Sequence, residues 1–273
     1  MKIKKQTEHV ACVELYGNLI LELHNLLSKA ECEQLIAVAN AKGWNRSSPS
    51  GGGHGRTGKE DARTNKFCVG ENPQLANELW RRIRPFLRTN LAETGLPMNT
   101  YISQVTRGTE WTPVLVCERF RYYKYDEGDV FPEHVDYKLA RTVVRLDPNT
   151  KQLKEYRQQS FFTLLIYLND SFQHGETGYW PNHKGIHCRF LRDQELKPHQ
   201  IVIRPRTGMG VIQEQNILHE GVAPTKGIKY ILRTDIIHEK EIQRDARLKV
   251  RPTRAQVGDW ERIFETSCKN YAD

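Results

Sequence analysis

The hydrophobic pattern changes character near residue 112. Before that point, two stretches carry apolar residues at helical spacing: Cys32, Leu35, Ile36 and Ala39 in one, and Leu75, Leu79, Ile83 and Leu87 in the other. Ser28 and Glu31 form a capping-box pattern at the start of the first stretch. Asn72-Pro73, a cap followed by proline at the first helical position, begins the second. Residues 1–111 are therefore predicted to give helical support around a few strands.

Residues 112–238 carry short β-branched and aromatic runs separated by turn residues. The runs cover residues 114–117, 120–125, 161–168, 200–203, 210–212 and 229–237. Several short strands at this spacing predict a jelly roll, a double-stranded β-helix of two sheets, and an α+β fold class. Residues 239–273 are charged and end in a predicted helix, whose apolar face we expect to dock on the barrel or on a second subunit. We expect residues 1–273 to form one domain.

Composition narrows the class of protein. Hydrophobic residues make up 38% of the 273 residues, enough for a core, and no apolar run approaches the roughly 20 residues that cross a bilayer. The N-terminus lacks the unbroken apolar region of a secretory signal. Six scattered cysteines form no paired spacing, which favours reduced thiols in the cytoplasm, with a nuclear location left open. The net charge of +8 favours acidic partners or is ordinary solubilising charge.

The tripeptide His134-Val-Asp136 is a candidate for two metal ligands. Side chains two apart on a strand point to the same face, so the imidazole and the carboxylate can reach one ion. His219, which follows a strand-like segment, is the best third candidate. Two histidines and one carboxylate leave open positions that suit non-haem Fe(II), whereas zinc prefers four-coordinate closure. For the tripeptide alone, a surface histidine beside a hydrogen-bonded aspartate is the competing interpretation.

Lys229 and Arg233 stand ten and fourteen residues after His219, on one face of a predicted strand. A cation inside a barrel is costly unless it is paired, and a dicarboxylate co-substrate would supply the missing anion. We expect Lys229 to be the main anchor and Arg233 the runner-up or a second contact. The alternative places both on an outward face, with Arg233 paired to Asp235.

The order of these motifs resembles the catalytic domain of the prolyl 4-hydroxylase-like 2-oxoglutarate/Fe(II)-dependent dioxygenases. The resemblance covers about residues 115–238. The motifs that carry it are Arg121-Tyr-Tyr-Lys-Tyr125, His134-Val-Asp136, Thr163-Leu-Leu-Ile-Tyr-Leu-Asn169, Gly175-Glu-Thr177, His219-Glu-Gly221 and Gly227-Ile-Lys229-Tyr-Ile-Leu-Arg233. Two departures lie in the barrel: His174-Gly175 replaces a glycine pair, and Gln213 stands where many members have an aromatic residue.

The resemblance implies an enzyme that uses Fe(II), 2-oxoglutarate and O2, with ascorbate as an accessory reductant. Its metal-binding and catalytic residues would be His134, Asp136 and His219, and its co-substrate would bind Lys229. The products would be succinate, CO2 and a hydroxylated protein, peptide or amino acid. Because Asp136 is present, hydroxylation is favoured over halogenation.

The resemblance also implies that Tyr125 and Tyr167 line the 2-oxoglutarate pocket. Core packing is the competing interpretation for both tyrosines. Two other functions stay open for the chain, a nucleic-acid oxidative demethylase and a non-catalytic binding module of the same fold. The demethylase class lacks the Gly227-Ile-Lys229 spacing, so we rank a peptide or amino-acid substrate first and expect no membrane partner.

The connection at residues 137–160 is long and basic, and it leaves the metal-binding tripeptide. Long segments at such places often form lids. We predict a substrate lid in which Arg141 and Arg145 favour acidic or phosphate-bearing targets. The alternative is a solvated hairpin without a contact to substrate.

Overall fold

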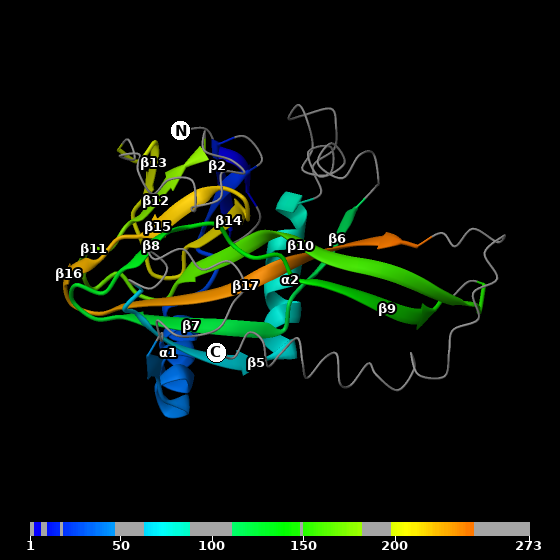
Figure 1. Ribbon diagram of the computed structural model, residues 1–273, viewed down its shortest axis with the longest axis horizontal. Helices are drawn as coiled ribbons and strands as arrows, with labels where there is room; N and C mark the ends of the chain where they lie inside the picture. The colour runs from blue at the N-terminus through cyan, green and yellow to red at the C-terminus, as the bar shows by residue number, and fades with distance from the viewer. Residues whose placement is uncertain are drawn as a thin grey trace.

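A computed structural model describes residues 3–6, 10–16, 19–46, 63–87, 111–147, 150–181 and 198–242 (Figure 1). The first part of the chain forms β1 (Ile3–Gln6), β2 (Ala11–Tyr16), β3 (Ile20–His24), α1 (Lys29–Lys42), β4 (Asn45–Arg46), β5 (Lys66–Glu71) and α2 (Pro73–Leu87). The middle part forms β6 (Thr112–Val116), β7 (Arg119–Tyr125), β8 (Phe131–His134), β9 (Ala140–Leu146), β10 (Leu153–Tyr167), β11 (Gln173–His174) and β12 (Thr177–Trp180). The last part forms β13 (Ile201–Ile203), β14 (Gly210–Glu214), β15 (Leu218–Gly221), β16 (Pro224–Lys226) and β17 (Lys229–Glu241). The predicted C-terminal helix lies outside the described residues.

The strands form a large and a small antiparallel sheet. The large sheet has the order β1-β2-β3-β14-β10-β17-β7-β5-β4, with β6 added beside β17 and β9 beside β10. The small sheet has the order β13-β12-β15-β8, and β11 pairs with β16. Apolar residues of the two sheets meet in one buried cluster. This arrangement confirms the predicted jelly-roll core and the α+β class.

Strands from the predicted N-terminal support join the same large sheet. β3 pairs with β14 and β5 pairs with β7, so the first hundred residues extend the jelly roll as well as carrying helices. The described N-terminal strands therefore belong to the same sheet as the jelly-roll strands, and a single domain over residues 1–273 stays a prediction.

Alternation along β17 divides the large sheet into two faces. Lys229, Ile231 and Arg233 are buried on the face toward the small sheet, and Leu232 and Ile236 are buried against the helices. A strand places successive side chains on opposite faces, so one strand serves both the barrel interior and the helix-covered core. The outward, solvated placement of Lys229 and Arg233 is therefore excluded.

The two helices begin where the sequence predicts. The Ser28 hydroxyl accepts a hydrogen bond from the Glu31 N–H at 3.2 Å, and the Glu31 carboxylate accepts one from the Ser28 N–H at 2.7 Å. The Asn72 side chain caps α2 by accepting from the Leu75 N–H at 3.0 Å. Arg82 of α2 also binds Glu31, which ties the helices together. Neither described helix is long and apolar enough to span a membrane.

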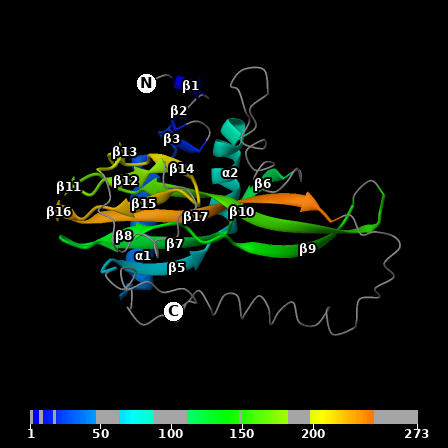
Figure 2. The ribbon, with the colours of Figure 1, turned by 45° about the horizontal axis from the view of Figure 1, so that its top comes forward.

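The connection at residues 137–160 is a β-ribbon. β9 pairs with the first half of β10 from Ala140 opposite Gln159 to Leu146 opposite Leu153, and the end of β17 pairs with β10 on its other side. The ribbon projects beyond the two sheets in both views (Figures 1 and 2). β9 and the first half of β10 are therefore extended and hydrogen-bonded to each other, as the hairpin interpretation expects.

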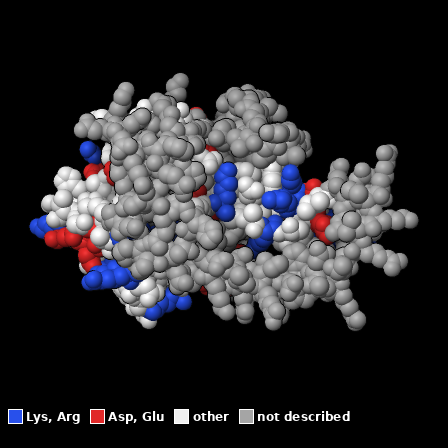
Figure 3. Space-filling model, viewed as in Figure 1, with Lys and Arg blue, Asp and Glu red and all other residues white. Residues whose placement is uncertain are grey.

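The predicted substrate residues on this ribbon already have protein partners. Arg141 binds the side chain of Gln158 at 2.7 Å and lies 3.5 Å from the Glu118 carboxylate. Arg145 forms an ion pair with Glu239. Basic and acidic surfaces lie side by side in this region (Figure 3). Arg141 and Arg145 are thus paired within the protein, and their substrate-binding role stays a prediction.

A buried histidine at the root of the ribbon should make the fold sensitive to acid. His238 is fully buried against Phe161 and Phe162, and burial lowers its pKa from 6.5 to about 4. The unfolded chain binds the proton more readily, so the stability that comes from neutral His238 is present above pH 6.5 and is lost as the pH falls toward 4.

We expect the free energy of unfolding to fall by about 2 kcal/mol through this group between about pH 7.5 and pH 5. A His238→Leu variant lacks the titrating group and should lose less stability over the same range. Urea unfolding at both pH values measures the difference. Equal losses of unfolding free energy in the wild type and in His238→Leu would show that His238 does not cause the acid sensitivity.

Candidate metal centre

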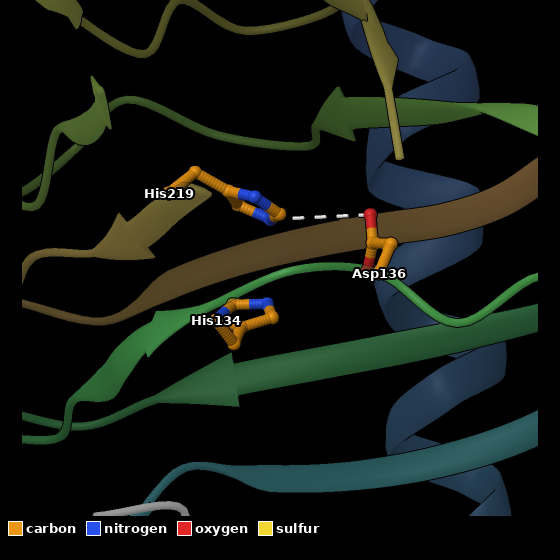
Figure 4. A group of neighbouring side chains, drawn as sticks. All are labelled: His134, Asp136 and His219. Carbon is orange, nitrogen blue, oxygen red and sulfur yellow. Dashed lines mark ion pairs between the residues drawn. The ribbon is translucent and has the colours of Figure 1, made fainter. Parts of the chain in front are cut away.

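Three predicted ligands converge between the two sheets. His134 is the last residue of β8 and stands directly opposite His219 of β15, while Asp136 lies two residues beyond the end of β8 (Figure 4). One ligand atom from each of the three side chains lies within 4.8 Å of the others. Since no other group of three or more such ligands occurs among the described residues, this is the candidate metal site.

The geometry departs from the sequence argument in one respect. His134 and Asp136 were expected to share a strand, but the strand ends at His134. The position of Asp136 is fixed instead by its backbone N–H, which donates to the Gln215 carbonyl at 2.9 Å. Its carboxylate is fixed separately by contacts to residues on the large sheet.

Both histidines present a free Nε2 to the site. Nδ1 of His134 lies 2.7 Å from the Pro132 carbonyl oxygen, and Nδ1 of His219 lies 2.9 Å from the Ile217 carbonyl oxygen. A carbonyl only accepts hydrogen bonds, so each Nδ1 carries the proton and each Nε2 keeps its lone pair. Burial lowers the pKa of both imidazoles, so both are neutral, as a metal ligand must be.

The carboxylate of Asp136 is ionised and held at both oxygens. Burial alone would raise its pKa, but Arg233 and the two histidines outweigh burial and hold the pKa below its ordinary value. Nη2 of Arg233 lies 3.0 Å from Oδ1, and the Thr163 hydroxyl donates to Oδ2 at 2.6 Å. Oδ2 is the oxygen that lies 3.9 Å from Nε2 of His219.

Gln213 links two of the three ligands, Asp136 and His219, to Tyr179 of β12. Its Oε1 accepts a hydrogen bond from the Tyr179 hydroxyl at 2.6 Å, and its Nε2 donates to Asp136 at 3.3 Å. The same amide nitrogen is almost equally far from the two ring nitrogens of His219, at 3.0 and 3.3 Å. A group on the lone-pair axis of His219 Nε2 would be much farther from Nδ1, so Gln213 leaves that axis open.

Lys229 is a buried cation without a counter-ion. Its side chain has no exposed surface, and its Nζ has no hydrogen-bond partner among the described residues. Burial lowers its pKa to about 7, and Glu176 opposes the shift only weakly. Nζ lies 4.8 Å from the centroid of the Tyr125 ring. Gly175 borders the lysine stem, where a Cβ atom would come within 3.3 Å of its Cδ.

The two predicted pocket tyrosines are both fully or almost fully buried on the inner face. Tyr125 stands opposite Lys229 across β7 and β17, and burial raises its pKa above the ordinary value. The Tyr167 hydroxyl lies 2.6 Å from the Thr177 hydroxyl. Both belong to the apolar cluster between the sheets, so they pack the core and border the inner face that carries Lys229.

Sequence reasoning missed an arginine beside His134. Phe131 stacks on the His134 ring with centroids 3.7 Å apart, and Cζ of Arg63 lies 4.3 Å from the Phe131 centroid. The Arg63 guanidinium also lies over Tyr123 and Phe67. Arg63 follows a glycine-rich stretch without hydrophobic periodicity, so the sequence held no pattern that could place it.

Comparisons with known proteins give structural likenesses of low sequence identity. No protein-family profile and no curated protein matches the chain. A viral collagen prolyl hydroxylase from Paramecium Bursaria Chlorella virus-1, solved with 2-oxoglutarate, is 15% identical at a TM-score of 0.43, over 81% of this chain and 96% of that one. The structural neighbours include prolyl hydroxylases and 2-oxoglutarate/Fe(II) oxygenases.

Two further neighbours are prolyl hydroxylases. A Pseudomonas putida prolyl-4-hydroxylase is 14% identical at a TM-score of 0.41, over 80% of this chain and 91% of that one. A Trichoplax adhaerens prolyl hydroxylase, solved with a hypoxia inducible factor peptide, is 13% identical at a TM-score of 0.44, over 80% and 84%. These likenesses are loose, and what the chain does is inferred from its own site residues.

Proposed function

We propose that the protein is a 2-oxoglutarate- and Fe(II)-dependent dioxygenase that hydroxylates a C–H bond of a protein, peptide or amino acid. The observation that carries the proposal is a pairing of two features. Two neutral histidines and an ionised aspartate converge at one point, and a buried lysine whose Nζ has no hydrogen-bond partner among the described residues lies between the same two sheets.

The donor set fits Fe(II). His134, Asp136 and His219 would supply two imidazole nitrogens and one carboxylate oxygen, which is the facial arrangement that leaves positions for a co-substrate and O2. The two carbonyl acceptors behind the imidazoles fix the Nδ1–H tautomer, which leaves Nε2 unprotonated before a metal arrives. No cysteine belongs to the group, so the set lacks the thiolates common in structural zinc sites.

The surroundings of Lys229 fit a dicarboxylate. An unpaired buried ammonium is destabilising, and a carboxylate in its place would restore the charge balance. We assign the distal carboxylate of 2-oxoglutarate to Lys229, with Tyr125 and Tyr167 lining the pocket. Arg233 already forms an ion pair with Asp136, so we do not assign it to the distal carboxylate of 2-oxoglutarate.

The bound iron would activate O2 as 2-oxoglutarate loses CO2, so that one oxygen atom enters succinate and the other becomes the hydroxyl of the product. The chain's own residues position and shield this chemistry. His134, Asp136 and His219 orient the metal, Lys229 orients the co-substrate, and the buried tyrosines exclude water. A reducing compartment suits this chemistry, and the buried, unpaired thiols of Cys32, Cys68 and Cys117 support one.

Turnover of 2-oxoglutarate tests the proposal directly. The full-length protein with Fe(II), O2 and 2-oxoglutarate should release succinate, and omission of any one of the three should stop it. Incubation with peptide and amino-acid pools should then give products heavier by one oxygen atom. Loss of a methyl group from a nucleic acid would favour the demethylase instead, and metal and 2-oxoglutarate binding without succinate would favour the non-catalytic module.

A further inference from the structure

The carboxylate of Asp136 is not positioned by strand pairing. Because β8 ends at His134, the backbone around Asp136 lies outside the strand ladder. A carboxylate can bind a metal through one oxygen or through both, and the choice depends on what holds the second oxygen. The residue on Oδ1 therefore matters for the geometry of the metal site.

Arg233 occupies that position. Its Nη2 lies 3.0 Å from Asp136 Oδ1, 3.3 Å from the Thr163 hydroxyl and 3.4 Å from Asp235 Oδ1. Asp235 is itself held by the Gln215 side chain, which donates to Oδ1 at 2.8 Å. One guanidinium thus lies between two buried carboxylates, and the second carboxylate balances its charge.

The two oxygens of Asp136 have different surroundings. Oδ1 faces the Arg233 guanidinium, whereas Oδ2 accepts from the Thr163 hydroxyl at 2.6 Å and from the Gln213 amide at 3.3 Å and lies 3.9 Å from Nε2 of His219. The donors on Oδ2 are neutral, so they oppose a metal ion at that oxygen less than a guanidinium does. A charged donor on Oδ1 opposes metal binding through that oxygen.

Arg233 is also badly placed for the far end of a dicarboxylate. It contacts a metal ligand directly, while the distal carboxylate must lie away from the metal. Lys229 stands four residues earlier on β17, which is about 13 Å along a strand. This spacing places Lys229 where it can bind the co-substrate and Arg233 where it contacts a metal ligand.

We propose that Arg233 is a positioning residue that holds Asp136 Oδ1, so that Asp136 offers the metal Oδ2 alone. This inference rests on the proposed metal site. Removing Arg233 frees the carboxylate to rotate or to bind through both oxygens, and it leaves two buried carboxylates without their shared cation. Metal affinity should fall, while the site for the distal carboxylate stays intact.

Cobalt(II) is a suitable probe because it binds oxygen-activating sites without turnover and has visible absorption bands that report ligand geometry. We expect Arg233→Met to weaken Co(II) binding by about 10–100-fold and to change the visible bands, with Arg233→Lys intermediate. At saturating Co(II), the affinity for 2-oxoglutarate should change by no more than about threefold. Arg81→Met, which removes an exposed arginine paired to Glu78 on α2, is the control and should leave both quantities unchanged.

Several outcomes would overturn the inference. One is an Arg233→Met protein whose Co(II) affinity and bands equal those of the wild type. Another is a large loss of 2-oxoglutarate affinity at saturating Co(II), which would make Arg233 a co-substrate anchor. If Arg233→Met does not fold, the double variant Arg233→Met/Asp235→Asn removes one carboxylate together with the cation, and wild-type Co(II) binding by that protein would overturn the inference as well. A wild-type protein that binds no Co(II) would instead contradict the metal site itself.

Discussion

Replacing His219 by alanine is expected to abolish 2-oxoglutarate turnover, with a loss of at least about a thousandfold in succinate release. His219 supplies one of three donors, and the cavity left by alanine has no replacement nitrogen. Among the described residues, Gln213 is the nearest polar side chain to the lost ring, and an amide is a much weaker ligand for Fe(II) than an imidazole. The affinity for Fe(II), measured by titration under anaerobic conditions, should fall together with succinate release.

His199 provides the matched control. It lies against Gly178 and binds Glu220 at 2.6 Å, on the side of the small sheet opposite to Tyr179 and His219. A His199→Ala variant should keep Fe(II) affinity and succinate release. If His219→Ala retains turnover at the wild-type rate, the metal site lies elsewhere and the proposed function loses its foundation.

A Lys229→Met variant should lose co-substrate binding and gain stability at the same time. The methionine fills a similar volume without a charge, so the apparent Kd for 2-oxoglutarate should rise by at least about a hundredfold. The same change removes a buried, unpaired ammonium, and the free energy of unfolding should rise by about 1–4 kcal/mol. Isothermal titration and urea unfolding of the same preparation measure the two effects.

The sign of the pH dependence supports this expectation. The folded pKa of Lys229 is lowered to about 7 from 10.5, so the unfolded chain binds the proton more readily and folding is penalised increasingly as the pH falls from 10.5 toward 7. A bound carboxylate raises the pKa again, so 2-oxoglutarate binding near and above pH 7 should take up protons. Lys229→Met should abolish that uptake, which calorimetry in buffers of different ionisation enthalpy detects.

Lys226→Met, a change at an exposed lysine three residues away, is the control and should alter neither affinity nor stability. A Lys229→Met protein with weakened 2-oxoglutarate binding but reduced stability would mean that Lys229 has a partner in the apo protein. Unchanged 2-oxoglutarate binding would place the distal carboxylate elsewhere. Either result leaves the His219 experiment as an independent test of the metal site.

Local chemistry explains why much of the fold could be predicted. The capping box at Ser28, the cap at Asn72 and the apolar helix faces depend on residues within one turn of each other, and all three appear as expected. The inner face of β17 was also predictable, because Lys229 and Arg233 are an even number of residues apart. The convergence of His134 and His219 was predicted through motif order rather than through periodicity.

What the sequence could not supply depends on contacts between distant segments. The Arg233 guanidinium was expected to pair with Asp235 or with a co-substrate. It lies 3.4 Å from Asp235 and also 3.0 Å from Asp136, 97 residues earlier in the chain, a contact that no pattern in the sequence indicated. Gln213 was noted only as a departure from a pattern, and its bridge from Tyr179 to Asp136 requires three separate elements. The ribbon of β9 and β10 is rich in charged and polar residues, so its sequence resembles a loop until the strand pairing is known.

The position of Lys229 at the start of β17 has a consequence for which dicarboxylates the protein can accept. β17 is hydrogen-bonded to β7 on one side and to β10 on the other, so the backbone under Lys229 and Arg233 cannot slide along the sheet. The backbone position of Lys229 relative to Arg233, which contacts the candidate ligand Asp136, is consequently set by main-chain hydrogen bonds. We expect chain length, more than charge, to decide which 2-oxo dicarboxylates bind, with oxaloacetate and 2-oxoadipate both binding more weakly than 2-oxoglutarate.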